Sequence, residues 1–483
     1  MKKELLRKFS IGRKKNEQSS SLLNSLSRTT CTIFNETQII KIIRLAFPAL
    51  VEFALQSVVQ YIDLYMVGEL GVNATAVVGL GSQVQFLVKF PMTGMSIGVL
   101  SSIAMAKGRG DVEKIRSMAG QSLRFSAVVG IFFWFLSFVV GVVSPIVFHL
   151  DPELVRDFYN YYFICYSTTV FFSLSSTYGS VLKGVGDMTS PMVINGLVNI
   201  LNIILNFVFI YRLSWGVKGA ASGTAISVAV GGVLMLIATL RNHETKFIRN
   251  DIRKNREVQK QFYRIGLPAG FTYISSGIGR TIFTSLISNL DPISVVAHFI
   301  SMTVESIFYI PAVGIQRGVA TLSGYYYGGS RQRELRRMLI DGSVITFLIM
   351  AVTGAALYAL GGDIAGFFTD SEDAVKVSDE VLKIISFSEP IFGISIVFQA
   401  VLEGMGKTKE TFLLSSFTMW LCRVVICSCV VYVFKGDLRS IWYCMIADNV
   451  LRAVLMYGRL KFKYLKIDKS DTTSSIRGKV KPQ

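Results

Sequence analysis

The sequence predicts an all-α polytopic membrane protein, with twelve transmembrane helices arranged in two pseudo-symmetric six-helix lobes. Two observations lead to this prediction: the apolar residues run in long segments, and the second half of the chain repeats the first half. Of the 483 residues, 51% are hydrophobic and 17% are charged, whereas a soluble domain carries about 25% charged residues. This composition excludes an ordinary soluble protein.

Three pairs of motifs define the repeat, and the offset between the two members is the same in every pair. Residues 45–49 and 265–269 share Pro-Ala, 94–98 and 314–318 share GxxxG, and 181–186 and 401–406 share Val-Leu-x-Gly-x-Gly. The constant offset means that no net insertion separates these motifs. Duplicated membrane halves are typical of secondary transporters, whose substrate site lies between the halves.

Twelve apolar segments are each long enough to cross a hydrocarbon core of roughly 30 Å as a helix. Six of them fall in each copy, so the two copies share one orientation in the membrane. The predicted spans are 42–67, 74–106, 117–143, 154–183, 190–211, 217–240, 262–289, 294–327, 337–361, 376–403, 411–434 and 438–460. The chain then divides into a basic N-terminal arm (1–40), a first lobe (41–240), a linker (241–261), a second lobe (262–461) and a tail (462–483).

The formal net charge of +18 could suggest a nucleic-acid partner, but its placement argues for membrane topology. Lysines and arginines gather in the arm, the linker, the tail and the loops after spans two and eight, whereas the loop 363–380 is acidic. Cytoplasmic loops carry such an excess of basic residues. We therefore expect a multi-pass protein of the plasma membrane with both termini in the cytoplasm and no nucleic-acid partner.

Small residues and prolines recur at equivalent places in the two copies. The GxxxG pairs permit close helix approach, which we interpret as generic packing. Pro48 and Pro268 lie in spans one and seven, where each removes a backbone hydrogen bond and can bend its helix.

Ionisable residues inside apolar spans are costly, so each one is a candidate site residue. The candidates are Glu52, Asp63, Lys89, Arg280, Glu305, Glu389, Arg423 and the i, i+4 pair Asp448 and Arg452. Counting residues from the span ends places Glu52 and Lys89 at one depth, where they could neutralise each other. The same count pairs Arg280 with Glu305, which suggests a mainly structural role there.

Asp63 is different because no basic residue of the first lobe's spans obviously lies at its depth. The repeat places Phe283 at the equivalent position, so the duplication does not explain this acid. Span five offers Asn202 and Asn206 on one helix face, and span six offers Thr224. A carboxylate with such neighbours can bind and release a proton or ligate a hard cation such as sodium. The alternative is a polar cluster that only ties helices together.

No motif indicates a cofactor or a metal. Residues 404–408, Gly-Met-Gly-Lys-Thr, resemble the end of a phosphate-binding loop, but Val401 stands where its first glycine belongs. Transport driven by ATP is therefore not expected. The three histidines share no ligand spacing, so we expect no bound group apart from the coupling ion, a proton or sodium.

Residues 61–68, Tyr-Ile-Asp-Leu-Tyr-Met-Val-Gly, together with residues 94–98, 183–187 and 216–221, resemble the multidrug and toxic compound extrusion (MATE) family. The resemblance covers essentially everything from about residue 40 to 465. It implies a V-shaped pair of lobes around a cleft that faces the cytoplasm and the outside in turn. It also implies export of cationic or amphipathic drugs and metabolites in exchange for protons or sodium.

The resemblance assigns site residues as well. It makes Asp63 the cation-coupling acid, with Asn202 and Thr224 as its polar neighbours and Pro48 as the bending proline. Asn206 is a departure, since one branch of the family carries a second aspartate there.

The second lobe departs further from the family pattern. Ser276 replaces a helix-seven glutamate of another branch, and no aspartate matches near Phe392 in helix ten. We therefore expect coupling through the first lobe alone, with the proton favoured over sodium. The charged residues Arg280, Glu305 and Arg423 are expected to shape the second lobe's half of the cleft.

Two other functions remain open. A lipid-linked oligosaccharide flippase of the same superfamily would bind pyrophosphate through basic cleft residues, for which Lys89, Arg280 and Arg423 are available. A membrane-embedded enzyme would need a metal or carboxylate-rich motif near the interface, and the sequence contains none. We expect a monomer that is not an enzyme and whose partners are the bilayer and a small-molecule substrate.

Overall fold

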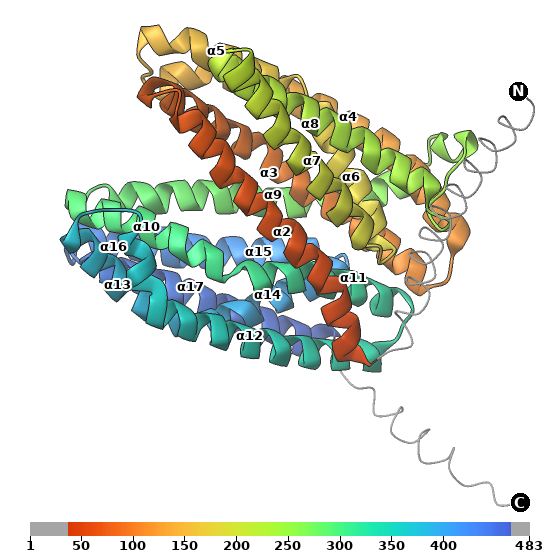
Figure 1. The fold of residues 1–483 in the computed structure, drawn as a ribbon. Coiled ribbons are helices and arrows are strands. Elements are labelled where there is room, and N and C mark those ends of the chain that lie inside the picture. The colour runs from red at the N-terminus through yellow and green to blue at the C-terminus, as the bar shows by residue number, and fades with distance from the viewer. Residues whose placement is uncertain (1–36, 465–483) are drawn as a thin grey trace, which may run out of the picture.

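A computed structural model describes residues 37–464, which are helical nearly throughout and contain no strand. The predicted arm (1–40) and tail (462–483) lie almost entirely outside these described residues. Figure 1 shows two helical bundles that touch where α2 begins and α17 ends and diverge toward the opposite end. The all-α fold and the V-shaped pair of bundles predicted from the sequence are confirmed.

The helices of the first half match the first six predicted spans in order. Span four is broken into α5 and α6, and span five ends in a π-helical segment. The elements are α2 (Gln38–Gly68), α3 (Val72–Gly108), α4 (Val112–Val147), α5 (Pro152–Tyr166), α6 (Thr169–Gly184), α7 (Thr189–Phe207) with the π-helical Val208–Arg212, and α8 (Gly216–Arg241).

The second half follows the same plan after a short 3-10 turn in the linker, Arg249–Ile252. Its elements are α9 (Arg256–Ile287), α10 (Pro292–Phe308), α11 (Ile310–Gly328), α12 (Gln332–Gly366), α13 (Glu372–Ser386), α14 (Glu389–Gly404), α15 (Thr408–Thr418), the π-helical Met419–Ile426, α16 (Cys427–Tyr432), α17 (Leu438–Arg459) and the π-helical Leu460–Tyr464. Each predicted span therefore corresponds to one helix or to a consecutive run of helices.

Bends recur at equivalent positions of the repeat. The break between α5 and α6 falls at Ser167 and Thr168, and the equivalent residues of the second copy, Phe387 and Ser388, separate α13 from α14. The α13–α14 pair bends by 55° and the α10–α11 pair by 49°. In contrast, α3 continues unbroken through the position equivalent to the α10–α11 break.

Fewer helices than the twelve predicted spans have the length and composition that are expected of a membrane-crossing helix. Among the described helices, seven are long and apolar enough, or nine if each bent pair is one span. The α5–α6 pair, α9 and α17 fall outside this group. The helices α5 and α6 have only 15 and 16 residues, and α9 and α17 contain more polar residues than the helices that qualify. Such helices can still cross within a bundle, where neighbouring helices cover their polar groups.

The two GxxxG motifs lie where the bundles meet, which is a more specific role than the generic packing expected. Gly94 and Gly98 of α3 face α9, and Gly314 and Gly318 of α11 face α2. A Cβ atom at Gly98 would lie only 2.5 Å from the carbonyl oxygen of Phe262. The repeat thus brings each motif against the first helix of the other half.

The helix α2 connects the two bundles, as Figure 1 shows by its diagonal course. Its first half, with Ile42 and Leu45, belongs to a core cluster that also contains Val319 of α11 and Val397 of α14. Its second half packs against α7 of the first bundle. The helix is continuous through Pro48. Because α2 belongs to both bundles, the lobe borders stay a prediction.

Candidate functional site

Asp63 lies in the second half of α2, on the side of α7, and the predicted polar residues surround it. Asn206 donates a 2.9 Å hydrogen bond from its Nδ2 atom to Asp63 Oδ1. With its amide nitrogen turned toward the acid, Asn202 donates to Oδ1 and Oδ2 at 3.1 and 3.0 Å. The other end of that amide then lies 3.4 Å from Thr224 Oγ1 on α8. The four residues predicted from the sequence therefore form one cluster.

Local sequence explains this arrangement. Asn202 and Asn206 are one turn apart on α7, so both amides point the same way, and both are buried. Gly223 of α8 provides the space for Asn206, since a Cβ there would lie 2.1 Å from its Oδ1 atom. That oxygen has no hydrogen-bond partner among the residues that the structure describes.

The chemistry of the cluster suits a small cation. Asp63 forms no ion pair with any Lys, Arg or His of residues 37–464. Carboxylate, amide and hydroxyl oxygens are the ligands that hard cations prefer. In the described arrangement both amides donate N–H groups to the carboxylate, so each would have to turn its oxygen toward Asp63 to ligate a cation there. A carboxylate held this way can alternatively take up a proton. The geometry is compatible with the predicted coupling role, which stays a prediction.

The predicted pairing of Glu52 with Lys89 is wrong. Glu52 Oε1 accepts hydrogen bonds from Lys183 Nζ at 2.9 Å and from Asn195 Nδ2 at 2.7 Å. Lys89 instead donates to Gln85 Oε1 at 2.6 Å. Counting residues from the span ends gives the depth of a side chain but not its direction around the helix axis, and the directions differ.

Lys183 is not among the candidate site residues predicted from the sequence. It lies in the motif Val-Leu-x-Gly-x-Gly at the end of a predicted span, where a charged residue is not unusual. One signal was available: the repeat places Glu403 at the equivalent position. A reversal of charge between otherwise matching motifs indicates that each side chain has its own partner. In the second copy, Glu403 accepts from Gln399 Nε2 at 2.8 Å.

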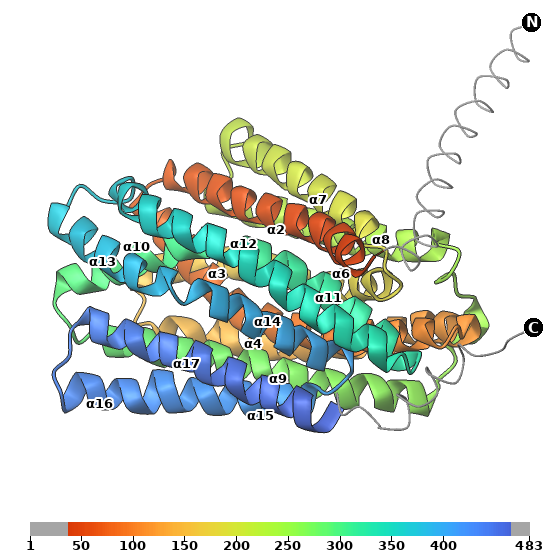
Figure 2. The same cartoon turned by 90° about the horizontal axis from the view of Figure 1, so that it is seen from below.

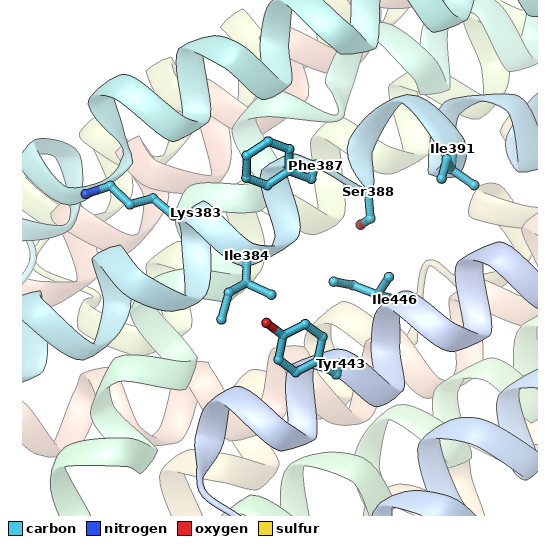
Figure 3. A pocket seen from close by; sticks show the side chains of 7 residues that line it. All are labelled: Lys383, Ile384, Phe387, Ser388, Ile391, Tyr443 and Ile446. Atoms are coloured by element: carbon cyan, nitrogen blue, oxygen red, sulfur yellow. The ribbon is translucent and has the colours of Figure 1, made fainter.

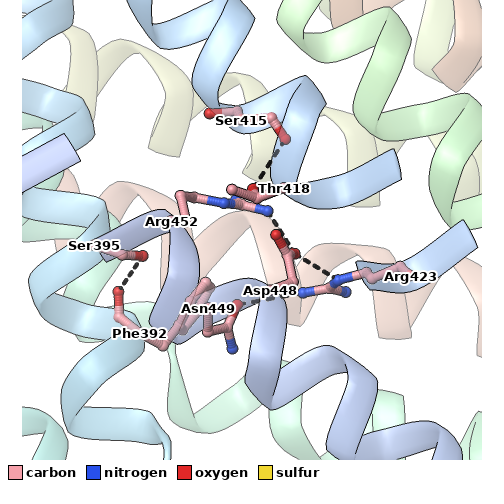
Figure 4. Close-up of polar contacts among 8 residues, drawn as sticks. All are labelled: Phe392, Ser395, Ser415, Thr418, Arg423, Asp448, Asn449 and Arg452. Atoms are coloured by element: carbon pink, nitrogen blue, oxygen red, sulfur yellow. Dashed lines mark hydrogen bonds and ion pairs between the residues drawn. The ribbon is translucent and has the colours of Figure 1, made fainter. Parts of the chain in front are cut away.

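In the second bundle the predicted pair Arg280 and Glu305 does not form. No nitrogen of Arg280 lies within 4.0 Å of a carboxylate oxygen of any described residue. The predicted pair Asp448 and Arg452 is confirmed, with Arg452 donating to Asp448 Oδ2 at 2.6 Å. The same oxygen accepts from Arg423 Nε at 2.7 Å (Figure 4).

Arg423 therefore belongs to an ion-pair network, and its predicted place in the cleft stays a prediction. Its second guanidinium nitrogen donates to Asn449 Oδ1 at 3.3 Å, and its guanidinium carbon lies 5.9 Å from the ring centroid of Phe283. Phe283 is the residue equivalent to Asp63 under the repeat. Where the first bundle holds an acid without a basic partner among the described residues, the second holds an acid, Asp448, already neutralised by guanidinium groups.

Comparisons with known proteins agree with this architecture. The MatE family model matches the chain twice, at residues 48–208 and 268–428. The second match follows the first with the same offset that relates the sequence motifs. The repeat found in the sequence is therefore a duplication of the family's own unit.

Relatives of known sequence cover nearly the whole chain. A probable multidrug resistance protein NorM of Thermotoga maritima is 26% identical over 419 residues, covering 86% of this chain and 90% of its own. A probable multidrug resistance protein YoeA of Bacillus subtilis is 24% identical over 436 residues, covering 87% and 92%.

Two solved structures share the fold at 22% identity, each covering 90% of this chain and 98% of its own. One is a MOP superfamily transporter from Pyrococcus furiosus, with a TM-score of 0.84. The other is an outward-facing multidrug resistance MATE family transporter, with a TM-score of 0.83. Because the family model matches more than half of the chain, the protein belongs to the MatE family of efflux transporters.

Proposed function

We propose that this protein exports cationic or amphipathic small molecules in exchange for a proton or a sodium ion. The observation that carries the proposal is Asp63, an acid inside the first bundle that has amide and hydroxyl neighbours and no basic partner among the described residues. The relatives named as multidrug resistance proteins support drugs as the substrate class.

The coupling step follows from the charge of Asp63. Its ionised form attracts a cationic substrate, and a proton or sodium ion arriving from outside neutralises it, so that the attraction ends and the substrate leaves. The helix that carries Asp63 also contacts the other bundle through its first half. A change in the charge of Asp63 can therefore alter the contact between the bundles. Coupling requires that the inward-facing and outward-facing conformations bind substrate and ion with different affinities, and such a link between the acid and the bundle contact would provide this difference.

The expected placement in the membrane supports an outward-open conformation. The bundles diverge at the end away from the start of α2 (Figure 1), and the basic loops and linker lie at the end where they meet. We propose that this closed end faces the cytoplasm, together with both termini. We also propose that a single chain, with lobes 41–240 and 262–461, is the transporting unit in the plasma membrane.

The test is efflux of ethidium from energised cells that express the wild type or Asp63→Asn, with the proton and sodium gradients collapsed separately. Asp363→Asn, which removes a carboxylate at the end of α12 far along the chain from the cluster, is the matched control. If export stops when one of the two gradients is collapsed, and if Asp63→Asn abolishes export, the ion of that gradient is the coupling ion. Export at the full rate by Asp63→Asn contradicts the role of Asp63.

A flippase for lipid-linked oligosaccharides is the second candidate. It is favoured by one observation: Lys89 and Arg280 form no ion pair with a described carboxylate, so both could receive a phosphate. If cells expressing the wild type export no ethidium under any gradient, translocation of a lipid-linked sugar by the reconstituted protein is the next measurement.

A further inference from the structure

A pocket of about 370 Å³ lies at the bend between α13 and α14, next to α17. Figure 2 shows α12, α13, α14 and α17 on the face of the second bundle that points away from the first. The elements that line the pocket therefore lie on the side of the second bundle opposite the first. Figure 3 shows the residues that line it, which are Lys383, Ile384, Phe387, Ser388, Ile391, Tyr443 and Ile446.

The surroundings of the pocket are those of a surface that meets lipid. Phe387 is 75% exposed and Tyr443 is 57% exposed, although both are large aromatic side chains. On a bundle that spans the membrane, an apolar outer face is covered by the bilayer. Tyr443 lies near the start of α17, at the end where the bundles diverge, so the pocket belongs to the leaflet on that side.

Ser388 is the observation that points to a ligand. Ser388 is 3% exposed, it forms part of the pocket wall, and its Oγ atom has no hydrogen-bond partner within residues 37–464. In Figure 3 this hydroxyl points toward the space between Phe387 and Ile446. Buried polar groups are almost always paired, so a partner from outside the chain is expected.

The first bundle supplies an internal comparison. The residue equivalent to Ser388 is Thr168, at the α5–α6 bend. Its Oγ1 atom donates a 2.8 Å hydrogen bond to the carbonyl oxygen of Cys165. The bend itself therefore does not require an unpaired hydroxyl, and the free donor is particular to the second bundle.

We propose that this pocket binds one acyl chain of a phospholipid from the leaflet on the side where the bundles diverge. The chain fills the space between Ile384, Ile391 and Ile446, and Ser388 donates to the ester carbonyl. Lys383, whose ammonium group already bonds Asp379 Oδ2 at 2.7 Å, keeps two further donors for the headgroup phosphate. The proposal does not depend on the coupling ion or the exported substrate.

The experiment uses the full chain in nanodiscs of phosphatidylcholine that contain a small fraction of the same lipid with a diazirine in its acyl chain. After illumination, adducts are mapped by mass spectrometry of peptides. We expect adducts concentrated on residues 383–391 and 443–446. Ile391→Trp, which fills the pocket, should lower them at least fivefold, and Ser388→Ala should lower them about twofold to fivefold.

Val454→Trp is the matched control, because Val454 lies on α17 outside the pocket and is 60% exposed. Its adducts in the pocket should equal those of the wild type. Adducts spread evenly over the exposed helices, and unchanged in both pocket variants, would overturn the proposal. So would displacement of the label by ethidium at micromolar concentration, since that result would make the pocket a drug site. Ethidium efflux by the same variants is measured separately, so failure of the lipid site and failure of export are distinguishable.

Discussion

Ser101 Oγ donates a 2.6 Å hydrogen bond to the carbonyl oxygen of Glu403, across the contact between the two bundles. The same bond occurs a second time with the halves exchanged, because Thr321 Oγ1 donates to the carbonyl oxygen of Lys183 at 3.1 Å. Thr321 is the equivalent of Ser101 in the second copy, and Glu403 is the equivalent of Lys183. The repeat therefore closes this end of the molecule with a reciprocal pair of hydrogen bonds.

The double variant Ser101→Ala, Thr321→Val should open the closed end more often. Each hydrogen bond contributes about 1 kcal/mol, so losing both should shift the equilibrium roughly tenfold or more toward separation. Ala104, buried beside Gly324 at this contact, reports the opening once it is replaced by cysteine in a cysteine-free background. The measurement is the rate of its modification by a membrane-impermeant maleimide.

Ser122→Ala is the control for that experiment. Ser122 is also buried, but its hydroxyl bonds to the carbonyl of Met118 in its own helix at 2.8 Å. If this variant accelerates modification as much as the double variant does, the effect is general loosening and the reciprocal bonds do not hold the end closed.

Gly98→Ala should weaken the contact between α3 and α9. The new methyl group would lie 2.5 Å from the backbone carbonyl of Phe262 and 2.7 Å from the amide of Gly266, and backbone atoms cannot move aside as a side chain can. Such overpacking costs about 1–3 kcal/mol, so the melting temperature of the purified protein should fall by several degrees. Gly277→Ala on α9 has no atom within 4 Å of the added group and should leave it unchanged or slightly higher. Equal melting temperatures for the two variants would contradict the close contact.

The repeat explains why so much of the fold was predictable. Hydrophobic segments define the spans. Because the offset is fixed, a span found in one half predicts a span at the equivalent position of the other half. The clustering of Asp63 with Asn202 and Asn206 was predictable for a related reason: two amides at i, i+4 must share a helix face, and the acid had no other partner at its depth.

The ion pairs could not be predicted in the same way. Glu52 meets Lys183 and Asn195 instead of Lys89, because depth along the membrane normal does not fix which neighbouring helix a side chain faces. The sequence suggests Arg423 as a cleft residue and gives no sign of its pairing with Asp448. Helix packing around the bundle axis decides these contacts, and a single sequence gives no measure of it.

Asn206→Ala should change how export depends on pH if the proposed coupling is correct. The variant removes a hydrogen bond to the ionised carboxylate of Asp63, and such bonds to a charged group contribute about 1.5–3 kcal/mol. The protonated form then persists to higher pH, so the half-maximal pH of ethidium export should move upward. Proteoliposomes with a fixed gradient and varied internal and external pH give the profile.

Asn199→Ala is the control for the pH profile, because Asn199 lies on α7 about one turn before Asn202 and, among the described residues, only Asn202 and Asn206 donate hydrogen bonds to Asp63. This variant should leave the profile in place. An unchanged profile in Asn206→Ala would remove that amide from the coupling site.

Arg423→Met should destabilise the second bundle without directly affecting coupling. Asp448 is fully buried, and breaking a buried ion pair costs about 3–5 kcal/mol, here at the lower end because Arg452 still bonds the same oxygen at 2.6 Å. The melting temperature should therefore fall. Arg423→Met combined with Asp448→Leu should lower it further, since the guanidinium of Arg452 then loses its carboxylate partner. Ethidium export, measured per folded molecule, should change less than twofold in the single variant. A variant with the melting temperature of the wild type and no export would instead show that the guanidinium acts on substrate, as expected of a cleft residue.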